Sequence, residues 1–203
     1  MHKEILTKEQ VALLPLVRSF SKEFGLVGGT AVALHLGHRR SIDFDLFTFK
    51  AFDNRNIRRK LSAFRKSLRV IRDEEGQYTL FIRDVRFTFL HYPYHLPFSR
   101  SLKDVVRMPD LLTLAAMKAF ALGRRAKWKD YIDLYFIMKH YRGIRKIAAK
   151  AKRLFGVEFN EKLFRVQLAY FKDVDDTEKV IYLEGREVSD ATVRKGLIEF
   201  SLQ

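Results

Sequence analysis

A pair of glycines followed by two closely spaced aspartates most constrains the fold of this chain. Residues 24–27 are typical of a short strand that runs into Gly28 and Gly29, and the segment from Thr30 to Leu36 is typical of a helix. Glycines at a strand-to-helix turn let backbone amides approach a phosphate, and the helix N-terminus adds partial positive charge. The turn therefore predicts a phosphate-binding site in a fold that combines strands and helices.

The two aspartates belong to a second predicted strand. Residues 42–47 alternate apolar and acidic residues, so this strand turns Ile42 and the other apolar side chains to one side and Asp43 and Asp45 to the other. At a rise of about 3.3 Å per residue, the aspartates lie roughly 6.5 Å apart at the backbone, close enough for both to reach one or two divalent cations. Mg²⁺ is the expected metal, because it prefers oxygen ligands and binds through few carboxylates plus substrate phosphates.

Each motif taken alone has an ordinary explanation. A Gly-Gly pair is usually a turn, and an Asp-x-Asp strand is often a solvated sheet face. The two motifs together instead favour a metal-dependent reaction on a nucleoside triphosphate.

Residues 28–47, which contain both motifs, resemble the signature of the AbiEii/AbiGii toxin family of nucleotidyltransferases, in the polymerase-beta-like superfamily. The resemblance implies an α+β fold of the polymerase-beta-like type, in which a small mixed sheet with helices precedes a mainly helical C-terminal half. It also implies that the triphosphate is held by Gly28, Gly29 and Thr30. By the same resemblance, Mg²⁺ is ligated by Asp43 and Asp45.

A later segment, residues 117–135, resembles the helical motif of the same family. By that match Lys118 contacts the nucleotide, and either Asp130 or Asp133 supports the active site. The residues just before the acidic strand add two nucleotide-binding candidates, Arg39 and Ser41. Arg39, or its neighbour Arg40, would stabilise charge on the departing pyrophosphate.

One position departs from the superfamily pattern. Polymerase-beta-like enzymes commonly carry a third carboxylate on a neighbouring strand, and the best candidate strand, residues 85–90, has Thr88 at that place. Asp84 begins this strand, but a shift by an odd number of residues would turn it to the wrong face. Two hypotheses follow: an active nucleotidyltransferase, or a catalytically weakened nucleotide- or RNA-binding module.

The resemblance implies a toxin of a toxin–antitoxin system, which transfers a nucleotide to a hydroxyl of RNA, at the tRNA acceptor end, and has a cognate antitoxin. A protein hydroxyl is the other acceptor considered. The charge agrees with an RNA partner, since 39 lysines and arginines against 24 acids give a net charge of +15. Basic residues concentrate at 55–72 and 118–129, either as solvated helix faces or as RNA contacts. Trp128 and Tyr131 are predicted to lie in the core rather than to stack on bases.

The chain is expected to be a cytoplasmic protein. It has no cysteine, which fits a reducing compartment. Its first residues are charged and lack the apolar segment of a secretory signal. No run of about twenty apolar residues would span a membrane.

The pattern of apolar residues predicts two domains, a nucleotidyltransferase sheet domain at residues 1–98 and a mainly helical region at residues 99–203. A helix at 7–22, with Thr7 as N-cap and Gln10 at capping-box spacing, should precede the first strand. An antiparallel meander is predicted from strands at 70–72, 78–82 and 85–90, after a helix at 54–68. Residues 92–100 are the predicted linker, and helices are expected at 110–122, 130–141, 144–155, 160–171 and 189–200.

Overall fold

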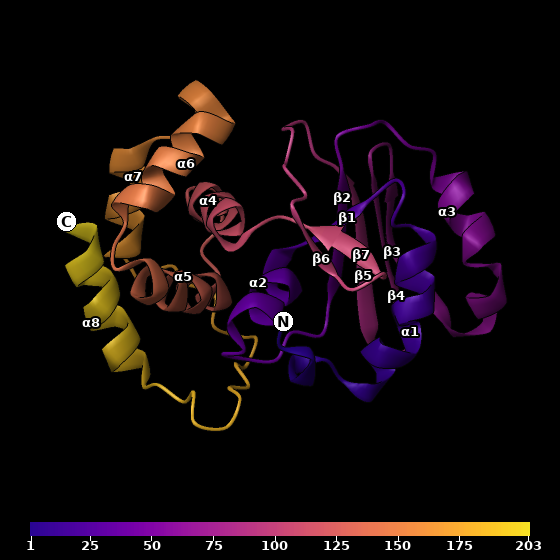
Figure 1. Ribbon diagram of the computed structural model, residues 1–203, viewed down its shortest axis with the longest axis horizontal. Helices are drawn as coiled ribbons and strands as arrows, with labels where there is room; N and C mark the ends of the chain where they lie inside the picture. Colours follow the sequence, from indigo (N-terminus) through magenta and orange to yellow (C-terminus); the bar gives the residue numbers. More distant parts are fainter. The chain divides into compact units, whose positions relative to one another are not determined.

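The computed structural model describes residues 1–203, which fall into two compact units (Figure 1). We call the first the sheet unit; it consists of Leu6–Ala31 and Ser41–Asp110. The second, the helical unit, consists of Met1–Ile5, Val32–Arg40 and Leu111–Gln203. The division falls within helix α2 (Gly28–Leu36). It does not test independent folding, so the domains predicted at residues 1–98 and 99–203 stay a prediction.

The sheet unit is built on a five-stranded sheet in the order β1-β2-β5-β4-β3. Strands β1 and β2 are antiparallel, β2 and β5 are parallel, and β5, β4 and β3 form the predicted antiparallel meander. The sheet is therefore mixed, as predicted. Its strands are β1 (Gly25–Val27), β2 (Phe44–Thr48), β3 (Leu68–Glu74), β4 (Gln77–Ile82) and β5 (Val85–His91).

Alternation along β2 and β5 separates the core from the polar face of the sheet. Phe44 and Leu46 on β2 are fully buried, as is Phe87 on β5, whereas Asp45 between the β2 pair is partly exposed. The prediction that Ile42 lies in this strand, on the same side as Phe44 and Leu46, is wrong. The strand begins only at Phe44, and the Ile42 side chain, outside the ladder, is 46% exposed.

Helix α1 (Lys8–Ser19) begins where the sequence predicts. The backbone N–H of Gln10 donates to the Thr7 hydroxyl at 3.2 Å, and the Gln10 side chain accepts from the Thr7 N–H at 3.1 Å. This reciprocal pair is the predicted capping box. After the helix, the ring of Phe20 packs on Phe89 of β5, with 4.7 Å between the ring centroids.

The helix predicted at 54–68 is wrong in its length. Helix α3 (Asn54–Lys60) is followed by a short 3₁₀ helix (Ser62–Ser67), and Leu68 already belongs to β3. Leu68 pairs with Ile82 on β4, so the chain must become extended before that point. Sheet pairing thus overrides the helical periodicity of this segment.

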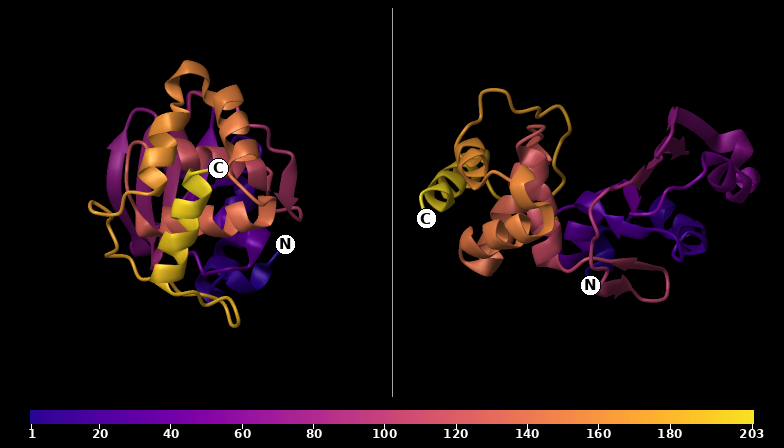
Figure 2. Two further views of the ribbon diagram at one scale, coloured as in Figure 1. Left: turned by 90° about the vertical axis from the view of Figure 1, so that its left-hand side faces the viewer. Right: turned by 90° about the horizontal axis from the view of Figure 1, so that it is seen from above.

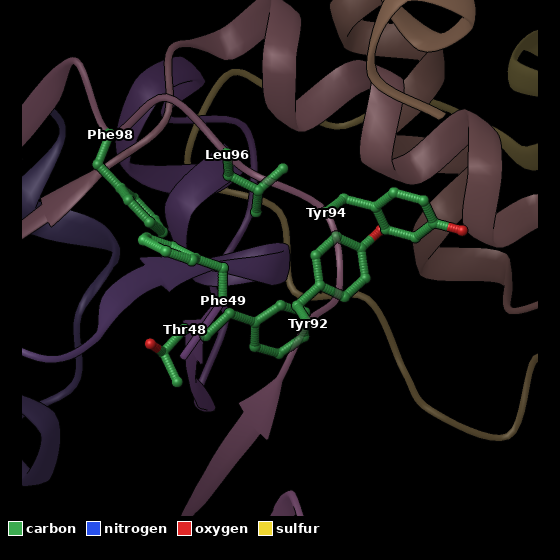
Figure 3. A pocket seen from close by; sticks show the side chains of 7 residues that line it. Thr48, Phe49, Tyr92, Tyr94, Leu96 and Phe98 are labelled. Carbon is green, nitrogen blue, oxygen red and sulfur yellow. The ribbon is translucent and has the colours of Figure 1, made fainter. Parts of the chain in front are cut away.

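The predicted linker is a packed part of the sheet unit. The N–H of Tyr92 donates to the carbonyl of Thr48 at 2.7 Å, and the Tyr92 ring lies 5.3 Å from that of Phe47. Together with neighbouring side chains these rings line a small pocket that contains none of the predicted site residues (Figure 3). A hairpin that the sequence did not predict follows, made of β6 (Arg100–Leu102) and β7 (Val106–Met108).

The helical unit contains the five helices predicted for the second half of the chain, with ends that differ by a few residues (Figure 2). Trp128 and Tyr131 are 5% and 0% exposed, which confirms that both belong to the core. None of the helices in the structure combines the length and the apolar character needed to cross a bilayer. The five helices are α4 (Leu111–Leu122), α5 (Trp128–Tyr141), α6 (Arg145–Phe155), α7 (Glu161–Leu168) and α8 (Asp190–Ser201).

Candidate functional site

The glycine turn lies against the second aspartate of the Asp-x-Asp motif. Val27, the last residue of β1, pairs with Asp45 on β2, and Gly28 follows at once as the first residue of α2. Gly28 has φ +71°, and a Cβ atom at this position would overlap with the Asp45 carboxylate. A carboxylate beside a helix N-terminus is electrostatically favoured. The turn therefore needs glycine both for its backbone angle and for the close approach of Asp45.

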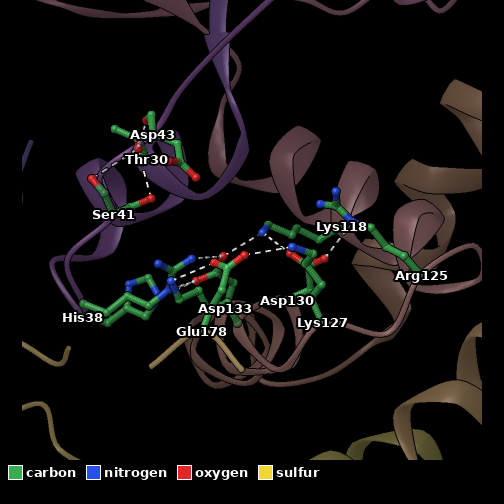
Figure 4. A network of polar contacts seen from close by, with 12 residues as sticks. Thr30, His38, Ser41, Asp43, Lys118, Arg125, Lys127, Asp130, Asp133 and Glu178 are labelled. Carbon is green, nitrogen blue, oxygen red and sulfur yellow. Dashed lines mark hydrogen bonds and ion pairs between the residues drawn. The ribbon is translucent and has the colours of Figure 1, made fainter. Parts of the chain in front are cut away.

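Thr30 joins the helix to the segment that precedes β2. Its side chain is buried, and its hydroxyl contacts the backbone carbonyl of Asp43 as a hydrogen-bond donor. The Ser41 hydroxyl lies 3.0 Å from the Thr30 hydroxyl oxygen (Figure 4). Because these bonds fix the backbone at Ser41 and Asp43, Thr30 acts here as a positioning residue for the first aspartate.

Arg86, a residue that the sequence analysis missed, forms an ion pair with Asp43. The guanidinium donates to the Asp43 carboxylate from the adjacent strand β5, and the two side chains are 35% and 23% exposed. The signal was present in the sequence, since the alternation that places Thr88 on the aspartate face also places Arg86 there.

Thr88 lies where the third carboxylate was expected. The parallel register of β2 and β5 pairs Asp45 with Thr88. Asp84 lies in the exposed turn before β5 and is not part of the strand. The side chain directly beside Asp45 on the neighbouring strand is therefore a neutral hydroxyl.

The donor set of the sheet unit fits Mg²⁺. Asp43 and Asp45 offer two partly exposed carboxylates, and the structure contains no group of three or more histidine, cysteine or acidic side chains able to hold a metal. Mg²⁺ usually binds through one or two carboxylates and takes its other ligands from phosphates and water. An N-terminal helix turn beside Asp45 suits the phosphates of such a complex.

The helical unit contains a buried ionic network centred on Asp133. The Asp133 side chain is 0% exposed, and its two carboxylate oxygens accept from Nε and Nη2 of Arg39 at 2.7 and 2.8 Å. His38 Nε2 lies 2.7 Å from the same carboxylate, and Lys118 Nζ lies 2.8 Å from it. Lys118 also pairs with Asp130, which accepts a further bond from Arg125 Nε at 3.2 Å.

The network fixes the charge of its members. Burial alone would raise the pKa of Asp133, but the charges of Arg39 and Lys118 outweigh it and hold this pKa well below its usual value. Burial opposes the charge of Lys118, yet Asp130 and Asp133 together raise its pKa. For His38 burial prevails and lowers the pKa below 6.5. The ring is thus neutral near pH 7 and donates from Nε2 to Asp133, in accord with an unpartnered Nδ1.

The predicted site residues form two groups. Asp43, Asp45 and the turn residues lie together in the sheet unit, whereas Lys118 and the residues around it lie together in the helical unit. Arg39 is 2% exposed, and its guanidinium is bound to Asp133. Arg40 is exposed.

A segment near the end of the chain pairs with the residues that lead toward Ser41. The N–H of Arg40 donates to Ile181 O at 2.8 Å, and the N–H of Leu183 donates to His38 O at 3.2 Å. Arg39 and Tyr182 form the bridge between them. No pattern in the sequence predicts this pairing.

Comparison with known proteins identifies a matching family. The sequence model of "Nucleotidyl transferase AbiEii toxin, Type IV TA system" matches residues 16–191. A protein of Aquifex aeolicus (strain VF5), "Uncharacterized protein aq_aa25", is 32% identical over 181 residues, which cover 83% of this chain and 84% of that protein. The family resemblance of the glycine and aspartate motifs is confirmed.

Two solved structures share the fold at 14% identity. The first is MenT4, a nucleotidyltransferase toxin from Mycobacterium tuberculosis H37Rv, with a TM-score of 0.60 over 94% of this chain and 80% of that chain. The second is ANT(2")-Ia in complex with adenylyl-2"-tobramycin, with a TM-score of 0.52 over 72% of this chain and 97% of that chain. The predicted nucleotidyltransferase fold is confirmed.

Proposed function

Since the chain belongs to the AbiEii family of nucleotidyltransferase toxins, we propose that it transfers a nucleotide from a nucleoside triphosphate to an RNA hydroxyl, at the acceptor end of tRNA, with Mg²⁺. The observation that carries this proposal is the close approach of the Asp45 carboxylate to the start of α2 at Gly28. It brings a candidate metal ligand beside backbone amides that can bind phosphate. A cognate antitoxin and a cytoplasmic location belong to the same proposal.

The side chains of the sheet unit have distinct proposed roles. Asp43 and Asp45 would hold Mg²⁺, and the backbone amides of Gly28 and Gly29 would bind the triphosphate. Thr30 keeps the backbone at Asp43 in place through its hydrogen bond. When bound, Mg²⁺ would neutralise charge on the phosphates and lower the pKa of an acceptor hydroxyl.

In the helical unit, Lys118 is the proposed nucleotide contact, and Asp130 is its proposed supporting residue. Their ion pair, together with Asp133, keeps the Lys118 amine protonated. A protonated amine suits a group that stabilises negative charge on phosphate. Asp133 has no exposed surface and binds Arg39, so we assign it a positioning role.

The test is incubation of the purified protein with each labelled nucleoside triphosphate, Mg²⁺ and total RNA. We expect label in the RNA fraction from one or more nucleotides, and about a hundredfold loss or more in Asp43→Asn and Asp45→Asn. Asp84→Asn is the matched control, because it is the same chemical change at a residue in an exposed turn. Unchanged incorporation by Asp43→Asn would show that the catalytic assignment is wrong.

The second candidate function is a nucleotide- or RNA-binding module without transfer activity. The neutral Thr88 beside Asp45, and Arg86 bound to Asp43, favour it. The same incubation separates the candidates, since label in RNA excludes the binding-only function. Label in the protein fraction would instead indicate that a protein hydroxyl is the acceptor.

A further inference from the structure

Helix α6 and the turn before it carry a basic surface. None of the roles proposed above involves this surface. Residues 142–153 include six cations and no acid. None of the six side chains forms an ion pair or a side-chain hydrogen bond in the structure, and five of them are exposed, while Lys150 is partly exposed. We call this set the α6 basic face; its members are Arg142, Arg145, Lys146, Lys150, Lys152 and Arg153.

The cations of the helix lie on one side of it. At 3.6 residues per turn, the five of them on α6 occupy an arc of roughly 160°, interrupted only by an exposed alanine, Ala149. The opposite side is apolar and buried, with Ile147, Ala151 and Phe155 facing the core of the unit. On the helix, the cationic surface extends roughly 12 Å from Arg145 to Arg153.

Many cations in the other basic segments of the chain have partners within the structure. Of the cations at 118–129, Lys118 and Arg125 bind Asp130, and Lys127 and Lys129 bind Glu178. In the segment 55–72, most of the basic side chains contact an acidic, amide or aromatic partner, as Arg58 does with Asp73. The two segments with the highest density of basic residues are therefore not the ones with the most unpaired charge.

The helix that carries the α6 basic face packs against α4. The ring of Phe155 stacks on that of Phe120 in α4, with 4.0 Å between centroids and 6° between planes. Figure 1 shows α6 lying beside α4, the helix that contains Lys118. The basic face thus belongs to the same packed helical unit as the proposed nucleotide contact.

We propose that the α6 basic face binds the sugar–phosphate backbone of the acceptor RNA. This inference rests on the proposed function, which names RNA as the acceptor. Unpaired lysines and arginines in a row match a polyanion, and their binding releases condensed counterions from it. The contact is with phosphates rather than bases, so it supplies affinity and orientation without sequence discrimination.

The decisive variant replaces Arg145, Lys146 and Arg153 with glutamine. All three side chains are exposed, and glutamine preserves helix propensity, so the fold is retained. The matched control replaces Arg65, Lys66 and Arg69 with glutamine, which removes the same amount of charge from the basic segment at 55–72. Both variants are compared with the parent protein by fluorescence anisotropy of a labelled tRNA transcript over a series of salt concentrations.

We expect the α6 variant to bind RNA about tenfold more weakly near 0.1 M salt, with a slope of log K against log salt that is shallower by about 2. The control should change both quantities much less. In the transfer reaction, the α6 variant should raise KM for RNA about tenfold and keep kcat at saturating RNA. Asp43→Asn should bind RNA as the parent does, so binding is measured independently of chemistry.

Equal RNA binding by the parent and the α6 variant, or an equal loss in the control, would overturn the inference while leaving nucleotidyl transfer intact. If the α6 variant keeps RNA binding but loses binding of an acidic protein, the face is a protein-docking surface and the inference is wrong. Conversely, weaker RNA binding by the α6 variant, with no transfer by any protein in the set, supports the surface and refutes the proposed activity.

Discussion

At the scale of single residues, the charge of Asp133 depends most on its buried partners. Removing a carboxylate from water is costly, and here the cost is offset by Arg39, His38 and Lys118, all of which are buried. The network is therefore interdependent, because each cation relies on the same carboxylate. Its loss would leave the buried Arg39 without its ion-pair partner and Lys118 with Asp130 alone.

Asp133→Asn should lower the free energy of unfolding by about 3–5 kcal/mol, since it leaves the buried Arg39 without its ion-pair partner and Lys118 with Asp130 as its remaining one. Urea denaturation followed by circular dichroism measures the change. Asp176→Asn is the control, because Asp176 is exposed, and it should change stability by less than about 0.5 kcal/mol. A loss below about 1 kcal/mol for Asp133→Asn would contradict the importance of the network.

Arg86→Gln should strengthen metal binding by the nucleotide-free protein. The guanidinium competes with a metal for the Asp43 carboxylate, and a partly exposed ion pair is worth up to about 1 kcal/mol, or about fivefold in affinity. Titration calorimetry with Mn²⁺ or Mg²⁺ measures this effect. Arg100→Gln, an exposed position in β6, should leave metal affinity unchanged. Weaker metal binding by Arg86→Gln would indicate that Arg86 orients Asp43 instead.

At the scale of elements, local patterns predicted most of the structure. The capping box at Thr7, the strand alternation that placed Thr88 beside Asp45, and the amphipathic helices are all signals between near neighbours in sequence. The features that the sequence did not show depend on distant partners. Arg39 meets Asp133 and Arg86 meets Asp43 only after folding, and the pairing of residues 38–40 with 181–183 leaves no periodic signal.

Gly28→Ala should destabilise the protein more than the same change at another glycine with positive φ. Gly28 and Gly185 have φ of +71° and +73°, but only at Gly28 would a Cβ meet Asp45, while at Gly185 it would meet nothing within 4 Å. The backbone penalty of about 1 kcal/mol is then common to both, and the overlap adds about 1–2 kcal/mol at Gly28. Parallel denaturation curves measure the difference. Equal losses would show that Asp45 moves aside freely.

Glu178 links the tail to the start of α5 and makes that link sensitive to acid. Hydrogen bonds from Lys127 and Lys129, 2.8 and 2.9 Å long, lower the pKa of Glu178 from 4.5 to about 2. A lowered carboxyl pKa contributes stability that is complete above about pH 4.5 and is lost as the pH falls toward about 2. Because Lys127 and Glu178 are more than a third exposed, solvent screening limits this stability to about 1 kcal/mol.

Glu178→Gln should therefore have a lower Tm than the parent protein at neutral pH, and the two values should converge as the pH falls from 4.5 toward 2. Thermal unfolding followed over this pH range measures the convergence. Glu187→Gln, at an exposed residue of the tail, is the control and should track the parent. A difference in Tm that is constant with pH would mean that the charge of Glu178 does not stabilise the tail.

At the scale of the whole molecule, the net charge of +15 is less informative than its distribution. Ion pairs use up much of the positive charge at residues 118–129, whereas the α6 basic face keeps all of its charge available. Composition predicted a polyanionic partner but not which segment keeps its charge unpaired, because a sequence count does not distinguish paired from unpaired cations.

A nucleoside triphosphate that is a substrate should stabilise the whole protein only in the presence of Mg²⁺. At a ligand concentration of about 100 times Kd, binding adds about 2.7 kcal/mol, which corresponds to a Tm increase of about 5–10 °C for a chain of this size. A thermal shift series with each nucleotide measures this effect, with EDTA as the metal-free reference. Asp43→Asn should show no shift and Asp84→Asn a full one. A shift of the same size in EDTA would contradict a metal-dependent nucleotide site.

The pairing of Ile181 and Leu183 with the backbone of His38 and Arg40 has a consequence for how the protein is made. Ribosomes synthesise the chain from its N-terminus, so residues 38–40 emerge long before residues 181–183 exist. Until then the backbone groups of His38 and Arg40 have only water or transient partners. The segment leading into Ser41 and the aspartates therefore gains its final hydrogen bonds late in translation, and a nascent chain that stops before residue 181 lacks them.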